Sequence, residues 1–197
     1  DATLGVVVLA AGKGTRMRSA LPKVLHAVCG KPMAAHILDA ARALSPAKVV
    51  VVAGYESAKV REALAAADVT FVEQTELLGT ADAVARCEAA LAGCERILVV
   101  NGDTPMITAE LLREVATASP ASPLVFVTCN VPSAGQLGRV SRDPAGNVTG
   151  IVEAADWTGP HGAAEINAGQ YRFGAAWLWS RLPKIPASPK GEYYLTH

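Results

Sequence analysis

The sequence lacks clustered cysteines and long hydrophobic runs, and each absence excludes a class of protein. Its four cysteines are scattered, with no Cys-x-x-Cys pair and no grouping with histidine, so the pattern does not indicate a zinc site. Scattered cysteines of this kind are typical of reduced thiols, which predicts a cytoplasmic protein. No apolar run reaches membrane-spanning length, so we expect no membrane partner.

The sequence also lacks an excess of either charge, with 18 basic and 18 acidic residues. Because general nucleic-acid binders carry a basic surplus, nucleic acid is not an expected partner. The charge is nevertheless uneven, since residues 1–31 contain five basic side chains and one acid. A concentrated basic segment in a neutral protein favours a small anionic ligand.

A glycine-rich loop follows an apolar, strand-like run near the start of the chain. Residues 5–11 read Gly-Val-Val-Val-Leu-Ala-Ala, and residues 12–17 read Gly-Lys-Gly-Thr-Arg-Met. Glycines let backbone N–H groups approach an anion, and the nearby Arg16, Arg18 and Lys23 add positive charge. This combination predicts a ligand that carries a polyphosphate.

Two other phosphate-binding motifs do not fit this loop. It has no Gly-x-x-x-x-Gly-Lys-Ser/Thr pattern, which excludes a P-loop. A dinucleotide fingerprint would need a third glycine where Met17 stands, and an acid about 20 residues further on that the sequence lacks. A nicotinamide-dependent oxidoreductase is therefore a disfavoured alternative.

Short apolar runs alternate with helical patterns over the first 130 residues. This alternation predicts an α/β fold with a Rossmann-like, mostly parallel sheet and helices on both faces. In such a sheet, ligands bind at the carboxyl ends of the strands, where the glycine loop and Asp103 both fall. The predicted strands are residues 6–10, 49–53, 69–72, 97–100 and 124–128; the predicted helical stripes lie at 34–44, 60–64 and 84–91, with Ser57, Thr80 and Thr108 as N-caps.

After residue 130 the pattern changes to antiparallel strands. Residues 139–142 and 148–153 flank the sequence Asp-Pro-Ala-Gly, which is typical of a hairpin turn, and residues 166–173 read as a further strand. We expect this half to form an inserted antiparallel hairpin layer that makes the second wall of a cleft. A composition that is 51% hydrophobic suits one globular domain over residues 1–197.

The motif Leu-Ala-Ala-Gly-x-Gly-Thr-Arg-Met followed by Pro-Lys resembles the signature of the sugar-nucleotide pyrophosphorylase family. The similarity is greatest to the uridylyltransferase domains that make UDP-N-acetylglucosamine. One glycine loop would be weak evidence, whereas seven segments in the family's order are strong evidence. The other six are Glu73-Gln74 with Gly79-Thr80, Asn101-Gly102-Asp103, Gly138-Arg139-Val140, Gly150-Ile151-Val152-Glu153, Glu165-Ile166-Asn167 and the run from Gly191 to Thr196.

The resemblance implies the nucleotide-diphospho-sugar transferase fold and Mg²⁺-dependent transfer of UMP from UTP to N-acetylglucosamine-1-phosphate. The products would be UDP-N-acetylglucosamine, a peptidoglycan precursor, and pyrophosphate. It also implies that the complete protein is a homotrimer with an acetyltransferase domain that residues 1–197 do not include. We expect this chain to be a shortened nucleotidyltransferase domain, which ends before the asparagine that serves the family as a second magnesium ligand.

The resemblance assigns roles to the matching positions. Arg16 and Lys23 would act as catalytic residues on the phosphates, and Asp103 would hold Mg²⁺. Asn101 departs from the family's usual residue, so no contact is implied there. The nucleotide would contact Leu9, Ala10, Ala11, Gly12, Gly14, Gln74, Gly79 and Thr80, and the sugar would contact Gly138, Glu153, Asn167 and Thr196.

Two alternatives remain open on the sequence. A nucleotidyltransferase of the same fold could use another base or sugar phosphate, although Gln74, Glu153 and Asn167 favour uridine and N-acetylglucosamine. A non-catalytic nucleotide-binding domain could share the fold, but the presence of Arg16 and Lys23 argues against it.

Overall fold

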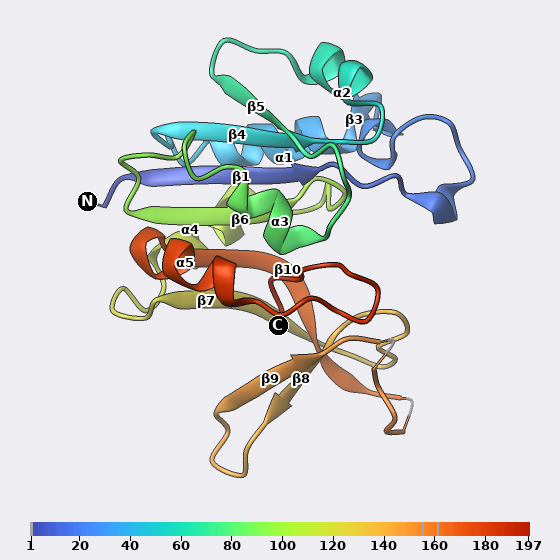
Figure 1. Cartoon of the computed structure of the whole chain (residues 1–197), viewed down its shortest axis with the longest axis vertical. Coiled ribbons are helices and arrows are strands. Elements are labelled where there is room, and N and C mark those ends of the chain that lie inside the picture. The colour runs from blue at the N-terminus through green and yellow to red at the C-terminus, as the bar shows by residue number, and fades with distance from the viewer. Residues whose placement is uncertain (1, 155, 161) are drawn as a thin grey trace.

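A mixed sheet of eight strands forms the centre of the molecule in this computed structural model, which describes residues 2–154, 156–160 and 162–197 (Figure 1). The strands are hydrogen-bonded in the order β5-β4-β1-β6-β10-β8-β9, and β7 also pairs with β10. Their bounds are β1 Leu4–Ala10, β4 Lys48–Ala53, β5 Val69–Glu73, β6 Arg96–Asn101, β7 Leu124–Val131, β8 Arg139–Arg142, β9 Val148–Val152 and β10 Ala164–Gly174.

Four neighbouring strands, β5, β4, β1 and β6, are parallel, as the sequence predicts. Strands β1, β4 and β6 are mostly apolar because both faces of the sheet are covered there, and the side chains of Val6, Val7 and Val8 have no exposed surface. In the β1–β6 register Leu9 pairs with Asn101. The glycine loop and the segment that carries Asp103 therefore leave the sheet side by side.

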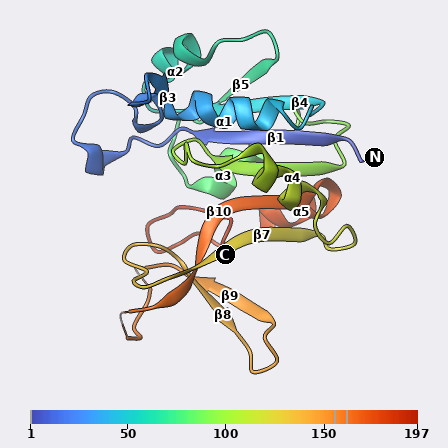
Figure 2. The ribbon, with the colours of Figure 1, turned by 180° about the vertical axis from the view of Figure 1, so that it is seen from behind.

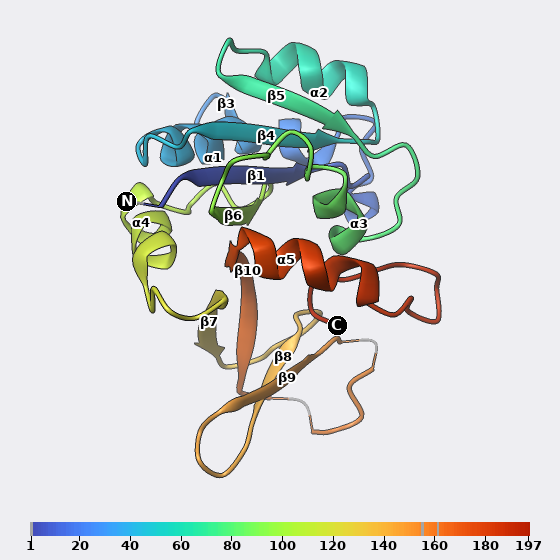
Figure 3. The same ribbon diagram turned by 60° about the vertical axis from the view of Figure 1, so that its left-hand side comes forward.

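Helices cover both faces of the sheet, which confirms the predicted Rossmann-like α/β fold class (Figures 2 and 3). One face carries α1 (Met33–Arg42), α2 (Ser57–Leu64) and α4 (Ala109–Thr117), and the other carries α3 (Thr80–Ala85) and α5 (Ala175–Arg181). The helical stripe predicted over 84–91 is wrong for most of its length, because α3 ends at Ala85 and residues 86–93 form turns. No helix within the described ranges is long and apolar enough to span a membrane.

Two of the three predicted N-caps are wrong. Ser57 and Thr80 are the first residues of α2 and α3, so Glu56 and Gly79 occupy the capping positions. The hydroxyl of Thr80 is used elsewhere, as an acceptor for the backbone of the last residues of the chain. Thr108 is confirmed as a cap, since its hydroxyl accepts a hydrogen bond from a backbone N–H in the first turn of α4.

The second half of the sheet is antiparallel and is organised around β10. This long strand pairs with β6, β7 and β8, so the run 124–128, which the sequence groups with the parallel strands, belongs to the antiparallel half. Strands β8 and β9 form the predicted hairpin, whose turn is held by Asp143 accepting hydrogen bonds from two backbone N–H groups. The hairpin is joined to the main sheet through β10 and projects from its lower end in Figure 1.

A buried arginine joins the two halves of the fold. Arg172 of β10 is 1% exposed, yet its guanidinium donates hydrogen bonds of 2.5–2.9 Å to the carbonyl oxygens of Ala118, Ser119 and Ser122. These carbonyls belong to the turn between α4 and β7. The buried guanidinium thus supplies donors to the turn that begins at the C-cap of α4.

Candidate nucleotide- and sugar-binding site

The glycine loop leaves β1 at the carboxyl edge of the sheet, extends away from it and returns before α1 (Figure 1). Ala10 and Ala11 are buried where the backbone leaves the strand, whereas the backbone at Gly12 faces open space. Gly14 has a φ of 66°, and a Cβ there would lie 2.5 Å from the Cβ of Lys23. Glycine is therefore needed for the loop to fold back onto Lys23. The returning segment contains the 3₁₀ turns η1 (Thr15–Met17) and η2 (Lys23–Leu25) and a ribbon of β2 (Ala27–Val28) and β3 (Lys31–Pro32).

Lys23 and Asp103 meet at this edge of the sheet. The Nζ of Lys23 lies 2.6 Å from Oδ2 of Asp103, and the two side chains are 39% and 32% exposed. Gly102 makes the approach possible, because its N–H donates to the carbonyl of Leu9 at 2.9 Å and a Cβ there would crowd the same oxygen. The structure thus pairs the predicted catalytic lysine with the predicted metal ligand, with part of each side chain open to a ligand.

Arg16 lies on η1 and is exposed. Among the described residues it has no ion-pair partner, so its positive charge is available to an incoming anion. The Lys23–Asp103 pair forms without it. The loop therefore presents Lys23, which is held by Asp103, and Arg16, which has no ion-pair partner in the described part of the chain.

Gln74 follows β5 and is 3% exposed. Its Nε2 donates to the carbonyl of Gly79 at 3.0 Å and to Oδ2 of Asp82 at 2.7 Å. Arg86, one turn further along α3, donates to the same Asp82 oxygen at 2.9 Å. A Cβ on Gly54 would lie 2.9 Å from the carbonyl oxygens of both Ala11 and Gln74, so the Gln74 segment lies close to the start of the glycine loop.

The last residues of the chain pack against Gly79 and Thr80. Gly79 has a φ of 94°, and a Cβ there would overlap the carbonyl oxygen of Tyr193. That oxygen accepts from Ala81 N at 2.9 Å, and Leu195 N donates to Oγ1 of Thr80 at 3.1 Å. Thr80 therefore has a structural contact in addition to its predicted place beside the nucleotide.

The four residues predicted to contact the sugar come together on the antiparallel half of the sheet. Asn167 N donates to the carbonyl of Gly138 at 2.9 Å, and Oγ1 of Thr196 donates to Oε1 of Glu153 at 2.7 Å. A Cβ on Gly138 would lie 3.4 Å from the same Glu153 oxygen. Four segments of the chain thus converge on one group of hydroxyl, carboxylate and amide side chains.

Asn167 lies at a β-bulge in β10, where the register with β7 shifts. Its Nδ2 donates to the hydroxyl of Tyr171, and its Oδ1 accepts from Gly169 N at 3.1 Å. Burial raises the pKa of Tyr171, and the hydrogen bond with Asn167 opposes the rise. The Asn167 amide retains one hydrogen and one lone pair for a ligand.

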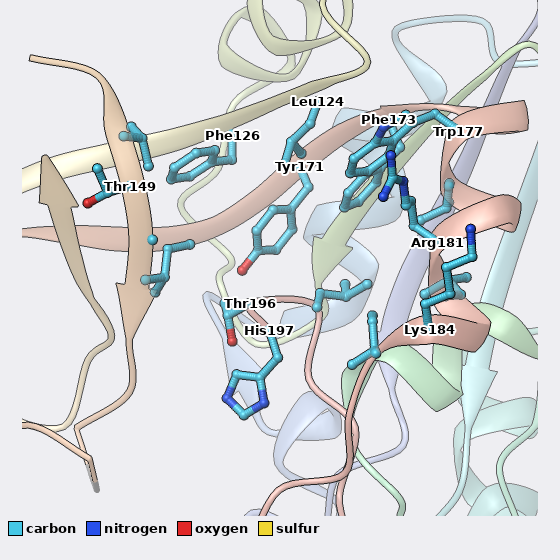
Figure 4. Close-up of a pocket in the computed structure, with 17 residues that line it drawn as sticks. Leu124, Phe126, Thr149, Tyr171, Phe173, Trp177, Arg181, Lys184, Thr196 and His197 are labelled. Carbon is cyan, nitrogen blue, oxygen red and sulfur yellow. The ribbon is translucent and has the colours of Figure 1, made fainter. Parts of the chain in front are cut away.

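A mostly apolar cavity of about 440 Å³ adjoins the sugar group (Figure 4). A series of stacked aromatic rings forms one wall, and Thr196 and His197 lie on the other. The Lys23–Asp103 pair and the glycine loop do not line it. The residues of the aromatic wall are Phe126, Tyr171, Phe173 and Trp177.

Some contacts at the site have no signal in the sequence. Asn101, the residue that departs from the family's pattern, lies against the backbone of Gly169, where a Cβ would overlap its amide nitrogen. Gly169 has a φ of 83°, so the bulge of β10 and the end of β6 fit together only because a glycine is present. Asp82 likewise contacts Gln74, and Tyr171 contacts Asn167, through packing that the sequence pattern does not indicate.

Comparison with known proteins decides the family. A family described as the MobA-like NTP transferase domain matches residues 6–160. The "Bifunctional protein GlmU" of Cupriavidus taiwanensis is 44% identical over 98% of this chain. The chain belongs to the MobA-like NTP transferase family. The resemblance to sugar-nucleotide pyrophosphorylases is thereby confirmed, and the chain carries a nucleotidyltransferase domain.

Two solved structures share the fold of this NTP transferase domain. A Bacillus anthracis protein, assigned as a glucose-1-phosphate thymidylyltransferase and crystallised with sucrose, matches with a TM-score of 0.82 at 18% identity, over 98% of this chain and 80% of that one. HddC from Yersinia pseudotuberculosis, in complex with GMP-PN, matches with a TM-score of 0.69 at 21% identity, over 98% and 83% of the two chains. The chain spans only 43% of the length of the Cupriavidus relative.

Proposed function

We propose that this domain transfers UMP from UTP to N-acetylglucosamine-1-phosphate with release of pyrophosphate. The observation that carries the proposal is the presence of two groups at one edge of the sheet. The Lys23–Asp103 pair lies beside the glycine loop, and the group around Glu153 lies on the antiparallel half. The Lys23–Asp103 pair with the glycine loop suits a triphosphate, and the group around Glu153 suits a sugar. UDP-N-acetylglucosamine made in this way would serve as a peptidoglycan precursor.

The chemistry requires charge neutralisation more than proton transfer. A phosphate oxygen of the sugar phosphate would attack the α-phosphorus of UTP, and the bond to the bridging oxygen of the β-phosphate would break as pyrophosphate leaves. Because the attacking phosphate is already ionised, no general base is needed. In the proposed reaction Lys23 would offset charge at the α-phosphate, and the exposed Arg16 would neutralise the β- and γ-phosphates.

Asp103 is the candidate ligand for Mg²⁺. Mg²⁺ favours one or two carboxylates together with substrate phosphates and water, rather than a complete cage of side chains. No cluster of three His, Cys, Asp or Glu residues able to hold a metal occurs in the described part of the chain, so the ion would be shared with the nucleotide. When bound, the metal would neutralise phosphate charge, and Lys23 would exchange its contact with Asp103 for one with a phosphate.

The ligand preference tests the proposal directly. We expect UTP and UDP-N-acetylglucosamine to bind at least about tenfold more tightly than ATP or NAD, because a site for the edge of a pyrimidine leaves purine groups unpaired. Calorimetric titration with the four compounds in the presence of Mg²⁺ measures this preference. Tighter binding of ATP or NAD would overturn the uridine assignment.

Glu153 tests the sugar side separately. Glu153→Ala should raise the KM for N-acetylglucosamine-1-phosphate about 10–100-fold, because it removes a charged acceptor and frees the Thr196 hydroxyl. The affinity for UTP should change little. Glu62→Ala, at an exposed position of α2, is the matched control. Equal losses for both substrates would indicate a disturbed fold and count against a sugar-specific role.

A further inference from the structure

The amide of Gln74 is held in one orientation by its neighbours. Both atoms that face its Nε2, the carbonyl oxygen of Gly79 and the carboxylate oxygen of Asp82, are hydrogen-bond acceptors only. The amide nitrogen must therefore lie between them, since a rotated amide would place its own oxygen against two other oxygens. The positions of the amide oxygen and nitrogen of Gln74 therefore follow from the chemistry of its two partners.

This arrangement uses both hydrogens of Nε2 and leaves Oε1 as the part of the amide that can meet a ligand. Among the described residues no donor is hydrogen-bonded to Oε1. This oxygen is also absent from the fully buried polar atoms that lack a hydrogen-bond partner, so part of its surface is accessible. A glutamine that is free to rotate can present either a donor or an acceptor. Gln74, which is 97% buried between fixed partners, presents only an acceptor.

Asp82 is itself fixed. It lies in the first turn of α3, and its Oδ2 accepts from both Gln74 and Arg86. The Gly79 carbonyl alone would hold one amide hydrogen, whereas the carboxylate makes the stronger, charge-assisted bond of 2.7 Å. The orientation of Gln74 thus depends chiefly on Asp82.

We propose that Asp82 is a positioning residue that sets base specificity by holding Gln74 as an acceptor. An acceptor at this point pairs with a base whose ring nitrogen carries hydrogen, such as N3 of uracil, and rejects cytosine, whose N3 is an acceptor. The inference rests on the proposed uridylyl transfer and adds the residue that selects uracil over cytosine. Asp82 acts through Gln74 and does not touch the base.

The test compares the affinities for UTP and CTP, measured by calorimetry with Mg²⁺ on the whole chain. Asp82→Ala should lower the CTP-to-UTP ratio of dissociation constants by about tenfold, because Gln74 can then rotate and offer its NH₂ to cytosine. Asp82→Asn should retain most of the discrimination, since the amide oxygen of asparagine can still accept from Gln74. Asp68→Ala, which removes another aspartate paired with an arginine at 2.6 Å, should leave the ratio unchanged.

The outcomes separate the two proposals. If the unaltered protein binds CTP or ATP more tightly than UTP, the uridylyl function itself is wrong. If it prefers UTP but Asp82→Ala keeps the same CTP-to-UTP ratio, the role of Asp82 is overturned. A general loss of affinity that leaves the ratio unchanged in Asp82→Ala would likewise contradict specificity, because a merely structural role weakens both nucleotides equally.

Discussion

Replacing Lys23 by alanine is expected to lower the rate of pyrophosphate release by about 10²–10³, with a much smaller change in nucleotide affinity. The reason is that charge builds up around the α-phosphorus in the transition state, where the lysine ammonium contributes most. Its ion pair with Asp103 is partly exposed, so the ammonium can leave that carboxylate for a phosphate when substrate binds. Steady-state kinetics with UTP and N-acetylglucosamine-1-phosphate would separate kcat from KM.

A matched control exists for this substitution. Lys59 pairs with Glu56 at 2.8 Å at the start of α2, a contact that involves neither Lys23 nor Asp103, and Lys59→Ala removes an equivalent ion pair. We expect that variant to retain the activity of the unaltered protein. A Lys23→Ala protein with nearly full turnover would show that the charge of Lys23 is not used in the reaction.

Replacing Arg172 by leucine is expected to reduce the free energy of unfolding by about 1.5–3 kcal/mol, as is typical when hydrogen bonds from a charged donor are lost. Three carbonyls of the turn between α4 and β7 would then lose the guanidinium that now donates to them. Leucine fills part of the space but offers no hydrogen bond. Urea unfolding, followed by circular dichroism, measures the change.

Arg113→Leu provides the comparison. Arg113 also donates to a carbonyl near a helix end, that of Ala43, but at the surface and at 3.2 Å. Since water can replace that bond, its loss should cost less than about 1 kcal/mol. Similar losses for the two variants would mean that burial of the Arg172 hydrogen bonds contributes nothing special to stability.

The parallel half of the fold could be predicted from the sequence because its signals are local. Each of its strands is a short apolar run, and the boundaries of β1, β4, β5 and β6 differ from the predicted ones by at most two residues. The shared edge of the glycine loop and Asp103 follows from the geometry of parallel strands. The residues at this edge could therefore be proposed before the fold was known.

The antiparallel half was predicted less completely, for a physical reason. An apolar run such as 124–128 has the same composition in a parallel or an antiparallel strand, and its direction is set by β10, which follows much later in the chain. Packing, and not the spacing of residues in the sequence, also determines two sets of contacts at the candidate site. These are the contacts of Gly79 and Thr80 with residues 193–195 and that of Gln74 with Asp82. The N-cap assigned to Thr80 was wrong, and its hydroxyl accepts instead from Leu195 N.

The contact between Thr80 and Leu195 also bears on the order in which the parts of the candidate site assemble during folding. Their hydrogen bond joins residues 115 positions apart in the sequence, and Tyr193 makes adjoining backbone hydrogen bonds with the same segment. Contacts of such high sequence separation form late in folding, after the local strand and helix pairs. A growing polypeptide would therefore complete its parallel strands and its glycine loop before the segment around Gly79 and Thr80 gains the contacts with residues 193–195 that fix its position.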